Sequence, residues 1–228
     1  MYQVVADEHD FIIIHKFSQV HFHSQDGHAG VVAQAEQDLG LKLFPVHRLD
    51  TMTSGLLILA KSSAAAATFT QLFEQHQVQK YYIAIAKGKP KKKQGWIIGD
   101  MAKSRRSMYK LLRSTKNPAK TLFFSHALGE GVRLYLLKPL SGKTHQLRVA
   151  LASIGVPILG DPLYGKGSTE GEDRGYLHAF VLAFRFHEQD YCYQCLPEQG
   201  VHFRNDAVVQ QLQLWSEPAS LDWPKSKK

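Results

Sequence analysis

The chain has 228 residues, of which 44% are hydrophobic and 21% charged, enough apolar material for the core of one large domain or two small ones. No apolar run approaches the roughly 20 residues of a membrane-spanning helix. The first eight residues end in acids rather than bases, so we expect no secretory signal. Two cysteines are too few to brace such a chain, which predicts a reduced, cytoplasmic protein with no membrane partner.

The formal net charge of +8 is concentrated in one block. Residues 80–120 hold 13 Lys and Arg against a single acid, Asp100, whereas the rest of the chain holds 15 bases and 19 acids. Such a block suits a polyanion, because each neutralised phosphate releases counterions. The alternative is a solvated surface that only aids solubility. Because the remaining chain is not basic, we favour contact with nucleic acid.

The N-terminal part alternates strand-like and helix-like segments. Residues 2–14 predict one or two strands around a turn at residues 7–10. Residues 29–39 have helical spacing that stops at Gly40. The next predicted elements are a buried strand at residues 55–60, a helix at 64–75 capped by Ser62 or Ser63, and a strand at 78–86.

The C-terminal part continues with more strands. The predicted elements are strands at residues 96–98, 121–128, 132–137 and 180–186, and helices at 144–152 and 206–215. Together these elements predict an α+β fold with a mixed, mainly antiparallel central sheet, flanking helices and a central catalytic cleft. We expect one domain over residues 1–228, with a disordered tail at about 218–228.

The stretch at residues 47–56 has a polar half followed by an apolar half. Its only acid, Asp50, falls at the rim of the predicted core, where a carboxylate is costly unless it is paired. Taken alone, Asp50 reads as a loop residue that caps a turn or pairs with Arg48. The whole stretch, however, resembles the H-R-L-D-x-x-T-S-G-L signature of the RluA-type RNA pseudouridine synthases, and this resemblance makes Asp50 the catalytic nucleophile.

Further segments resemble the same family in the same order. Residues 80–84 are similar to its K-x-Y-x-A strand, which implies that Tyr82 stacks on the target base, with Tyr81 as the packing alternative. Residues 142–148 resemble G-R-T-H-Q-[IL]-R and imply that Arg148 keeps Asp50 ionised, although a helical Arg148 reads equally well as a surface residue. Residues 155–165 and 174–179 resemble G-x-P-I-x-G-D-x-x-Y-G and R-x-x-L-H-A.

Four positions depart from the family pattern. Phe17 stands where proline is usual and Gln19 where glycine is usual, and both family residues fix special backbone dihedrals. Lys143 stands where arginine is usual, and it is a weaker bidentate partner for phosphate. Ala150 stands where histidine is usual. Their effect on substrate choice stays open.

The resemblance implies a uridine in rRNA or tRNA, flipped out of a loop, as the substrate of a monomeric enzyme. Isomerising uridine conserves atoms and electrons, so we expect no cofactor. Direct attack of Asp50 on C1′ and abstraction of the 2′ proton both stay open. The expected substrate-binding residues are His47, Arg48, Thr53, Lys103, Arg105, Arg106, Lys143, His145 and Leu147, of which Leu147 would close the pocket.

The alternative to this enzyme is an inactive RNA-binding or ribosome-assembly factor of the same fold. Such a factor explains the charge block, but not Asp50, Tyr82 and Arg148 together at motif positions. Metal sites are conceivable at His21 with His23, and at Cys192 with Cys195, with His187 and His202 near in sequence. Residues three apart in a strand point to opposite faces, and we expect no metal. We also expect no N-terminal accessory RNA-binding domain, because the motifs start early.

Overall fold

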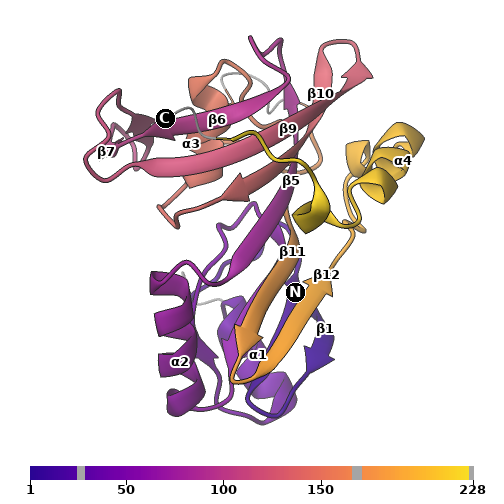
Figure 1. Ribbon diagram of the computed structural model, residues 1–228. Coiled ribbons are helices and arrows are strands. Elements are labelled where there is room, and N and C mark those ends of the chain that lie inside the picture. The colour runs from indigo at the N-terminus through magenta and orange to yellow at the C-terminus, as the bar shows by residue number, and fades with distance from the viewer. Residues whose placement is uncertain (25–28, 166–170, 226–228) are drawn as a thin grey trace. The chain divides into compact units, whose positions relative to one another are not determined.

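The computed structural model describes residues 1–24, 29–165 and 171–225 (Figure 1). Contacts divide the chain into two compact units. Unit 1 comprises Met1–Lys80 and His178–Pro197, and unit 2 comprises Tyr81–Leu177 and Glu198–Lys228. The expectation of one domain over residues 1–228 stays a prediction. None of the helices in the described ranges has the length and apolar character that crossing a membrane requires.

Unit 1 is built on strands in the order β1-β2-β4-β11, with β3 beside β4 and β12 beside β11. β4 pairs in parallel with β11 and antiparallel with β2 and β3. Two helices complete the part of unit 1 that the structure describes. The elements are β1 (Tyr2–Asp7), β2 (Phe11–Lys16), α1 (Val31–Leu39), β3 (Phe44–Pro45), β4 (Ser54–Ala60), α2 (Ser63–Glu74), β11 (Leu177–Phe186) and β12 (Gln189–Gln194).

The core of unit 1 follows from its apolar runs. Every residue of β2 and of β4 is buried, as their unbroken hydrophobic stretches predict. The ring of Phe11 makes edge contacts with Phe69 on α2 and Phe184 on β11, at centroid distances of 5.3 and 5.5 Å. The predicted stop of α1 and the predicted cap of α2 are confirmed: Gly40 ends α1 in the left-handed conformation, and the Ser62 side chain caps α2. The helix predicted at residues 29–39 begins two residues later, at Val31.

Unit 2 contains an antiparallel sheet in the order β5-β10-β9-β6 and a separate two-stranded hairpin, β7-β8. The sheets of the two units are therefore mixed and mainly antiparallel, and the predicted α+β class is confirmed. The hairpin was not predicted. The elements are β5 (Gln79–Lys87), β6 (Gln94–Gly99), β7 (Met101–Lys103), β8 (Tyr109–Leu111), β9 (Ala119–Gly129), β10 (Val132–Pro139), α3 (Gln146–Ser153), α4 (Asp206–Leu214), and 3-10 turns at His202–Arg204 and Pro218–Ser220.

The C-terminal segment corrects one expectation. The sequence predicts a disordered tail at about 218–228, but residues 218–225 pack within unit 2, beginning with a 3-10 turn. The Trp223 ring lies 4.6 Å from the ring of Phe124, and the Trp96 indole N–H donates to the carbonyl of Pro224 at 2.7 Å. A tryptophan adds enough apolar contact to order a short tail. Residues 226–228 lie outside the described part of the chain.

Candidate active site

Asp50 lies in a braced turn of unit 1. The backbone N–H of Thr53 donates to the carbonyl of Asp50 at 3.0 Å, and Asp50 itself is half-buried. The ammonium of Lys16, fully buried, donates to the carbonyls of Phe17, Val20 and Thr51. A buried ammonium is costly unless it is well hydrogen-bonded. Lys16 therefore ties the end of β2 to the turn that carries Asp50.

Two family departures fall beside this lysine, and the structure explains how each is accommodated. Gln19 has a φ of 62°, so it adopts the left-handed conformation that the usual glycine would favour. The Phe17 N–H donates to the carbonyl of Met1 at 2.9 Å, a bond that the usual proline lacks. The hydroxyl of Ser18 also donates to the carbonyl of Met52, at 2.9 Å. The loop therefore adopts a left-handed conformation at Gln19 and a backbone hydrogen bond at Phe17 without the glycine and proline that are usual in the family.

His47 points into unit 1. Its Nε2 accepts a hydrogen bond from the Ile58 N–H at 2.9 Å, and its ring lies 4.9 Å from that of Phe73. Burial, reinforced by the charge of Lys80, lowers the pKa of His47 to about 3. The imidazole is therefore neutral and serves as an internal acceptor. Its predicted contact with substrate stays a prediction.

Arg148, on α3 of unit 2, is only 4% exposed, so the surface alternative is wrong. Its Nε and Nη2 donate to the two carboxylate oxygens of Asp161, each at 2.8 Å. The same carboxylate accepts from the N–H groups of Leu163 and Tyr164. The pair engages two of the five guanidinium N–H groups. Sequence reasoning assigned Asp50 as the partner and missed Asp161; pairing of Arg148 with Asp50 stays a prediction.

The two tyrosines at the start of β5 differ in burial. Tyr81 is fully buried, with its ring 6.0 Å from that of Trp223, whereas Tyr82 is half-buried. Neighbouring residues in a strand face opposite sides of a sheet. Tyr81 therefore belongs to the packing of unit 2. Stacking of Tyr82 on the target base stays a prediction.

The start of α3 is held by side chains of the family-like segment at residues 142–148. The helix begins at Gln146, two residues later than predicted, after His145 in a left-handed conformation with a φ of 56°. The Gln146 amide donates to the carbonyl of Lys120 and the hydroxyl of Thr121. Leu147 is 7% exposed, and the Lys143 ammonium donates to the Asn117 side chain at 3.0 Å. These contacts fix the helix on which Arg148 sits.

Comparison with known proteins decides the family. Residues 10–153 match the family described as RNA pseudouridylate synthase. The chain belongs to this family. A Haemophilus influenzae protein described as an uncharacterized RNA pseudouridine synthase is 46% identical, covering 93% of this chain and 95% of its own length. This pseudouridine synthase is therefore an isomerase that converts uridine to pseudouridine in RNA.

Other relatives agree. The ribosomal large subunit pseudouridine synthase C of Rickettsia bellii is 36% identical over 53% of this chain and 41% of its own length. The structure of human RNA pseudouridylate synthase domain containing 1 covers 99% of this synthase and 97% of its own chain, with a TM-score of 0.74 at 24% identity. At 24% identity this likeness is evidence for the fold alone, and it confirms the predicted pseudouridine synthase fold.

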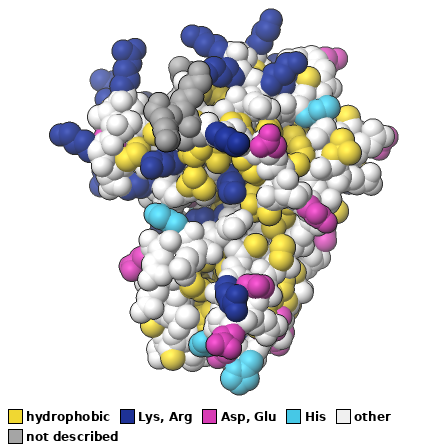
Figure 2. Space-filling view, viewed as in Figure 1, with side chains coloured by type: hydrophobic (Ala, Val, Ile, Leu, Met, Phe, Trp, Pro, Cys, Tyr) yellow, Lys and Arg dark blue, Asp and Glu magenta, His cyan; other side chains and the backbone are white. Residues whose placement is uncertain are grey.

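Three of the basic residues predicted to bind substrate lie on the β7-β8 hairpin of the synthase. Lys103, Arg105 and Arg106 are all exposed, and Arg106 has a φ of 51° in the turn. Figure 2 shows Lys and Arg side chains gathered over β6 and β7. The one acid of the basic block, Asp100, accepts the backbone N–H groups of Lys116 and Asn117 and so braces the base of the hairpin. The lone acid thus has a structural role.

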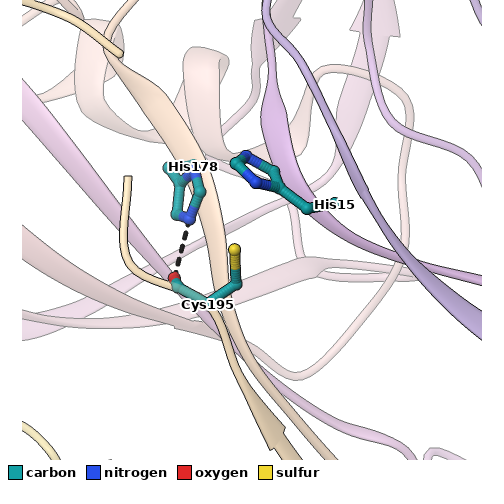
Figure 3. A group of neighbouring side chains, drawn as sticks. All are labelled: His15, His178 and Cys195. Atoms are coloured by element: carbon teal, nitrogen blue, oxygen red, sulfur yellow. Dashed lines mark hydrogen bonds between the residues drawn. The ribbon is translucent and has the colours of Figure 1, made fainter. Parts of the chain in front are cut away.

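In unit 1, Figure 3 shows His15, His178 and Cys195, a group that the sequence did not predict. Their potential ligand atoms lie within 4.8 Å of one another. The His178 Nε2 lies 2.8 Å from the Cys195 carbonyl, which only accepts, so Nε2 donates. The His178 Nδ1 lies 2.8 Å from the Ser54 hydroxyl. Both nitrogens of His178 thus join β4, β11 and the segment after β12, and His178 acts as a structural link.

Proposed function

We propose that this synthase modifies a uridine flipped out of a loop in rRNA or tRNA, with Asp50 as the nucleophile. The observation that carries this proposal is the buried lysine that braces the Asp50 turn, because burying an ammonium costs free energy. A fully buried ammonium at Lys16 hydrogen-bonds to three carbonyls, one of them in the turn itself. A solvated loop needs no such device, whereas an acid that must meet a ribose carbon needs a fixed backbone.

The reaction breaks the N1–C1′ bond of uridine and forms a C5–C1′ bond, so no electrons are gained or lost. In one route, the Asp50 carboxylate attacks C1′ and the uracil leaves as an anion. The base then turns, C5 attacks C1′ and Asp50 departs. The C5 proton is lost to a base and N1 gains a proton, which completes the isomer. In the other route, Asp50 removes the 2′ proton as the uracil leaves, and a proton returns to C2′ when C5 bonds to C1′. Both routes need an ionised Asp50, and a nearby guanidinium favours that charge state.

Arg148 is the residue proposed to supply this guanidinium. Its bond pair to Asp161 fixes the plane of the fork, which costs the reaction no reorganisation. Tyr82 is proposed to stack on the extruded uracil, and Leu147 to close the pocket. Arg48, Lys143 and His145 are proposed to line the RNA-binding surface, and His47 and Thr53 to support it from inside unit 1. Lys103, Arg105 and Arg106 are proposed to hold phosphates.

The RNA class is proposed from charge and from a relative. The exposed basic side chains of the hairpin suit a folded RNA, in which phosphates lie close together. One relative carries the name of a ribosomal large subunit enzyme, which favours rRNA as the first substrate to test. We further propose a monomer that works in the cytoplasm, where Cys192 and Cys195, which form no disulfide, stay reduced.

The test is to incubate purified protein with total rRNA and total tRNA and to map pseudouridine at single-nucleotide resolution. Asp50→Asn should abolish product while RNA affinity changes less than threefold. Asp190→Asn, an exposed acid on β12, is the matched control and should keep full activity. Product from Asp50→Asn would show that Asp50 is not the nucleophile. Tight RNA binding by the wild-type protein without product would favour the inactive factor.

A further inference from the structure

Tyr164 joins three parts of unit 2 that are apart in sequence. Its hydroxyl accepts a hydrogen bond from the backbone N–H of Tyr109, the first residue of β8, at 2.8 Å. The same hydroxyl lies 3.0 Å from Nδ1 of His145, the residue before α3. Its ring lies 5.2 Å from the guanidinium carbon of Arg148. One side chain, 6% exposed, therefore contacts the hairpin, the start of α3 and the buried arginine.

The direction of these bonds follows from the donor inventory. The Tyr109 N–H is a donor only, so the hydroxyl oxygen of Tyr164 accepts from it. The single hydroxyl proton is then available to Nδ1 of a neutral His145. The Tyr109 and His145 rings also meet edge to face at 5.7 Å. The hydroxyl thus bridges a backbone group of the hairpin and a side chain at the start of α3.

The hairpin needs such a tether. Its two strands have three residues each, and a two-stranded ribbon is marginal in water without outside contacts. Asp100 braces its base through Lys116 and Asn117. The Tyr164 hydroxyl is a second attachment on its flank. With both in place, the exposed Lys103, Arg105 and Arg106 are presented in one orientation.

We propose that Tyr164 is a positioning residue that sets the phosphate-binding hairpin in register with the helix of Arg148. Its hydroxyl acts on RNA binding, whereas its ring packs on the arginine. This inference rests on the proposed contact between the hairpin and RNA. It goes beyond the proposed function, because it assigns the Tyr164 hydroxyl to RNA binding and the Tyr164 ring to the packing of Arg148.

Tyr164→Phe isolates the hydroxyl, since the ring over Arg148 remains. Losing one hydrogen bond that orders the β7-β8 hairpin should raise KM for RNA about five- to tenfold. The single-turnover rate at saturating RNA should stay within twofold of wild type. In the RNA-free protein, the Tyr109 amide should exchange with deuterium faster, while the amides of β9 and β10 keep their protection. Tyr193→Phe is the matched control: it also removes a bonded hydroxyl, to Glu8, but in unit 1.

A double-mutant cycle with Arg105→Ala completes the test. If Tyr164 orders the β7-β8 hairpin, Arg105→Ala should weaken RNA binding less in the Tyr164→Phe background than in the wild type. Unchanged exchange at Tyr109, unchanged KM, or a fall in the saturated rate alone would overturn the proposal. If the wild-type protein makes no pseudouridine, the exchange data and the RNA affinity still judge the tether, so its failure and that of the proposed function are told apart.

Discussion

Asp161 grips Arg148 through two parallel hydrogen bonds of 2.8 Å, with the carboxylate fully buried and the arginine 4% exposed. The planar fork of the guanidinium matches a carboxylate edge to edge, so this pair fixes orientation as well as distance. The Tyr164 ring adds a cation–π contact to the same guanidinium. The arginine of α3 is thus oriented by residues of the following loop before any RNA arrives.

Arg148→Lys should retain the charge and lose the fork. A lysine cannot reproduce the bidentate bond to Asp161, so we expect the single-turnover rate to fall at least tenfold, about 1.4 kcal/mol in the activation free energy. Arg185→Lys is the matched control, because Arg185 is exposed on β11 and should tolerate the change. A wild-type rate in Arg148→Lys would show that charge alone suffices.

Lys16→Met should destabilise the protein. Three carbonyls would lose the donor that Lys16 supplies, and we expect the free energy of unfolding to drop by about 3 kcal/mol in a urea titration. The turn of Asp50 should loosen, so the turnover rate should fall as well. Lys42→Met, at an exposed position, should change the free energy of unfolding by less than about 0.5 kcal/mol. Equal stability of the two variants would contradict the bracing role of Lys16.

His47 should make the protein less stable in acid. Its pKa is lowered to about 3 in the folded state from an ordinary value of 6.5. Between these values the unfolded chain binds a proton that the folded chain does not, so the contribution of His47 is complete above pH 6.5 and is lost as the pH falls towards 3. The expected slope is about 1.4 kcal/mol per pH unit.

His47→Gln isolates this effect, because glutamine can still accept from the Ile58 N–H but does not titrate. Urea titrations from pH 7 to pH 4 should show the stability difference between wild type and His47→Gln shifting steadily towards the variant as the pH falls. His47→Phe, which lacks the acceptor, should be less stable than His47→Gln at pH 7. If the free energy of unfolding varied with pH in the same way for wild type and His47→Gln, the lowered pKa of His47 would be refuted.

The two departures beside Lys16 should respond in opposite ways to family-like residues. Gln19→Gly should raise the free energy of unfolding by about 0.5–1 kcal/mol, because a φ of 62° strains glutamine more than glycine. Phe17→Pro should lower it by about 1 kcal/mol or more, since the N–H bond to Met1 is lost. Thermal melts of both variants test this pair, and a destabilised Gln19→Gly would mean that the glutamine side chain holds the loop.

Local signals predicted the secondary structure well. The Gly40 stop, the Ser62 cap and the apolar runs of β2 and β4 act within a few residues, so they can be read along the chain. The short hairpin β7-β8 was missed because its strands have three residues each and a basic, mixed sequence. The ordered C-terminal segment was missed because it depends on the contact of Trp223 with Phe124, which is far away along the chain.

The family, the α+β class and the acid, tyrosine and arginine to test could all be predicted from the residues alone, because motif order and periodicity lie along the chain. The folded chain was needed to see that Asp161 orients Arg148, that His47 turns inward to Ile58, and that Tyr164 reaches the hairpin. These are hydrogen bonds between groups brought together by packing. Their partners are chosen by distance and burial in three dimensions, which no local pattern encodes.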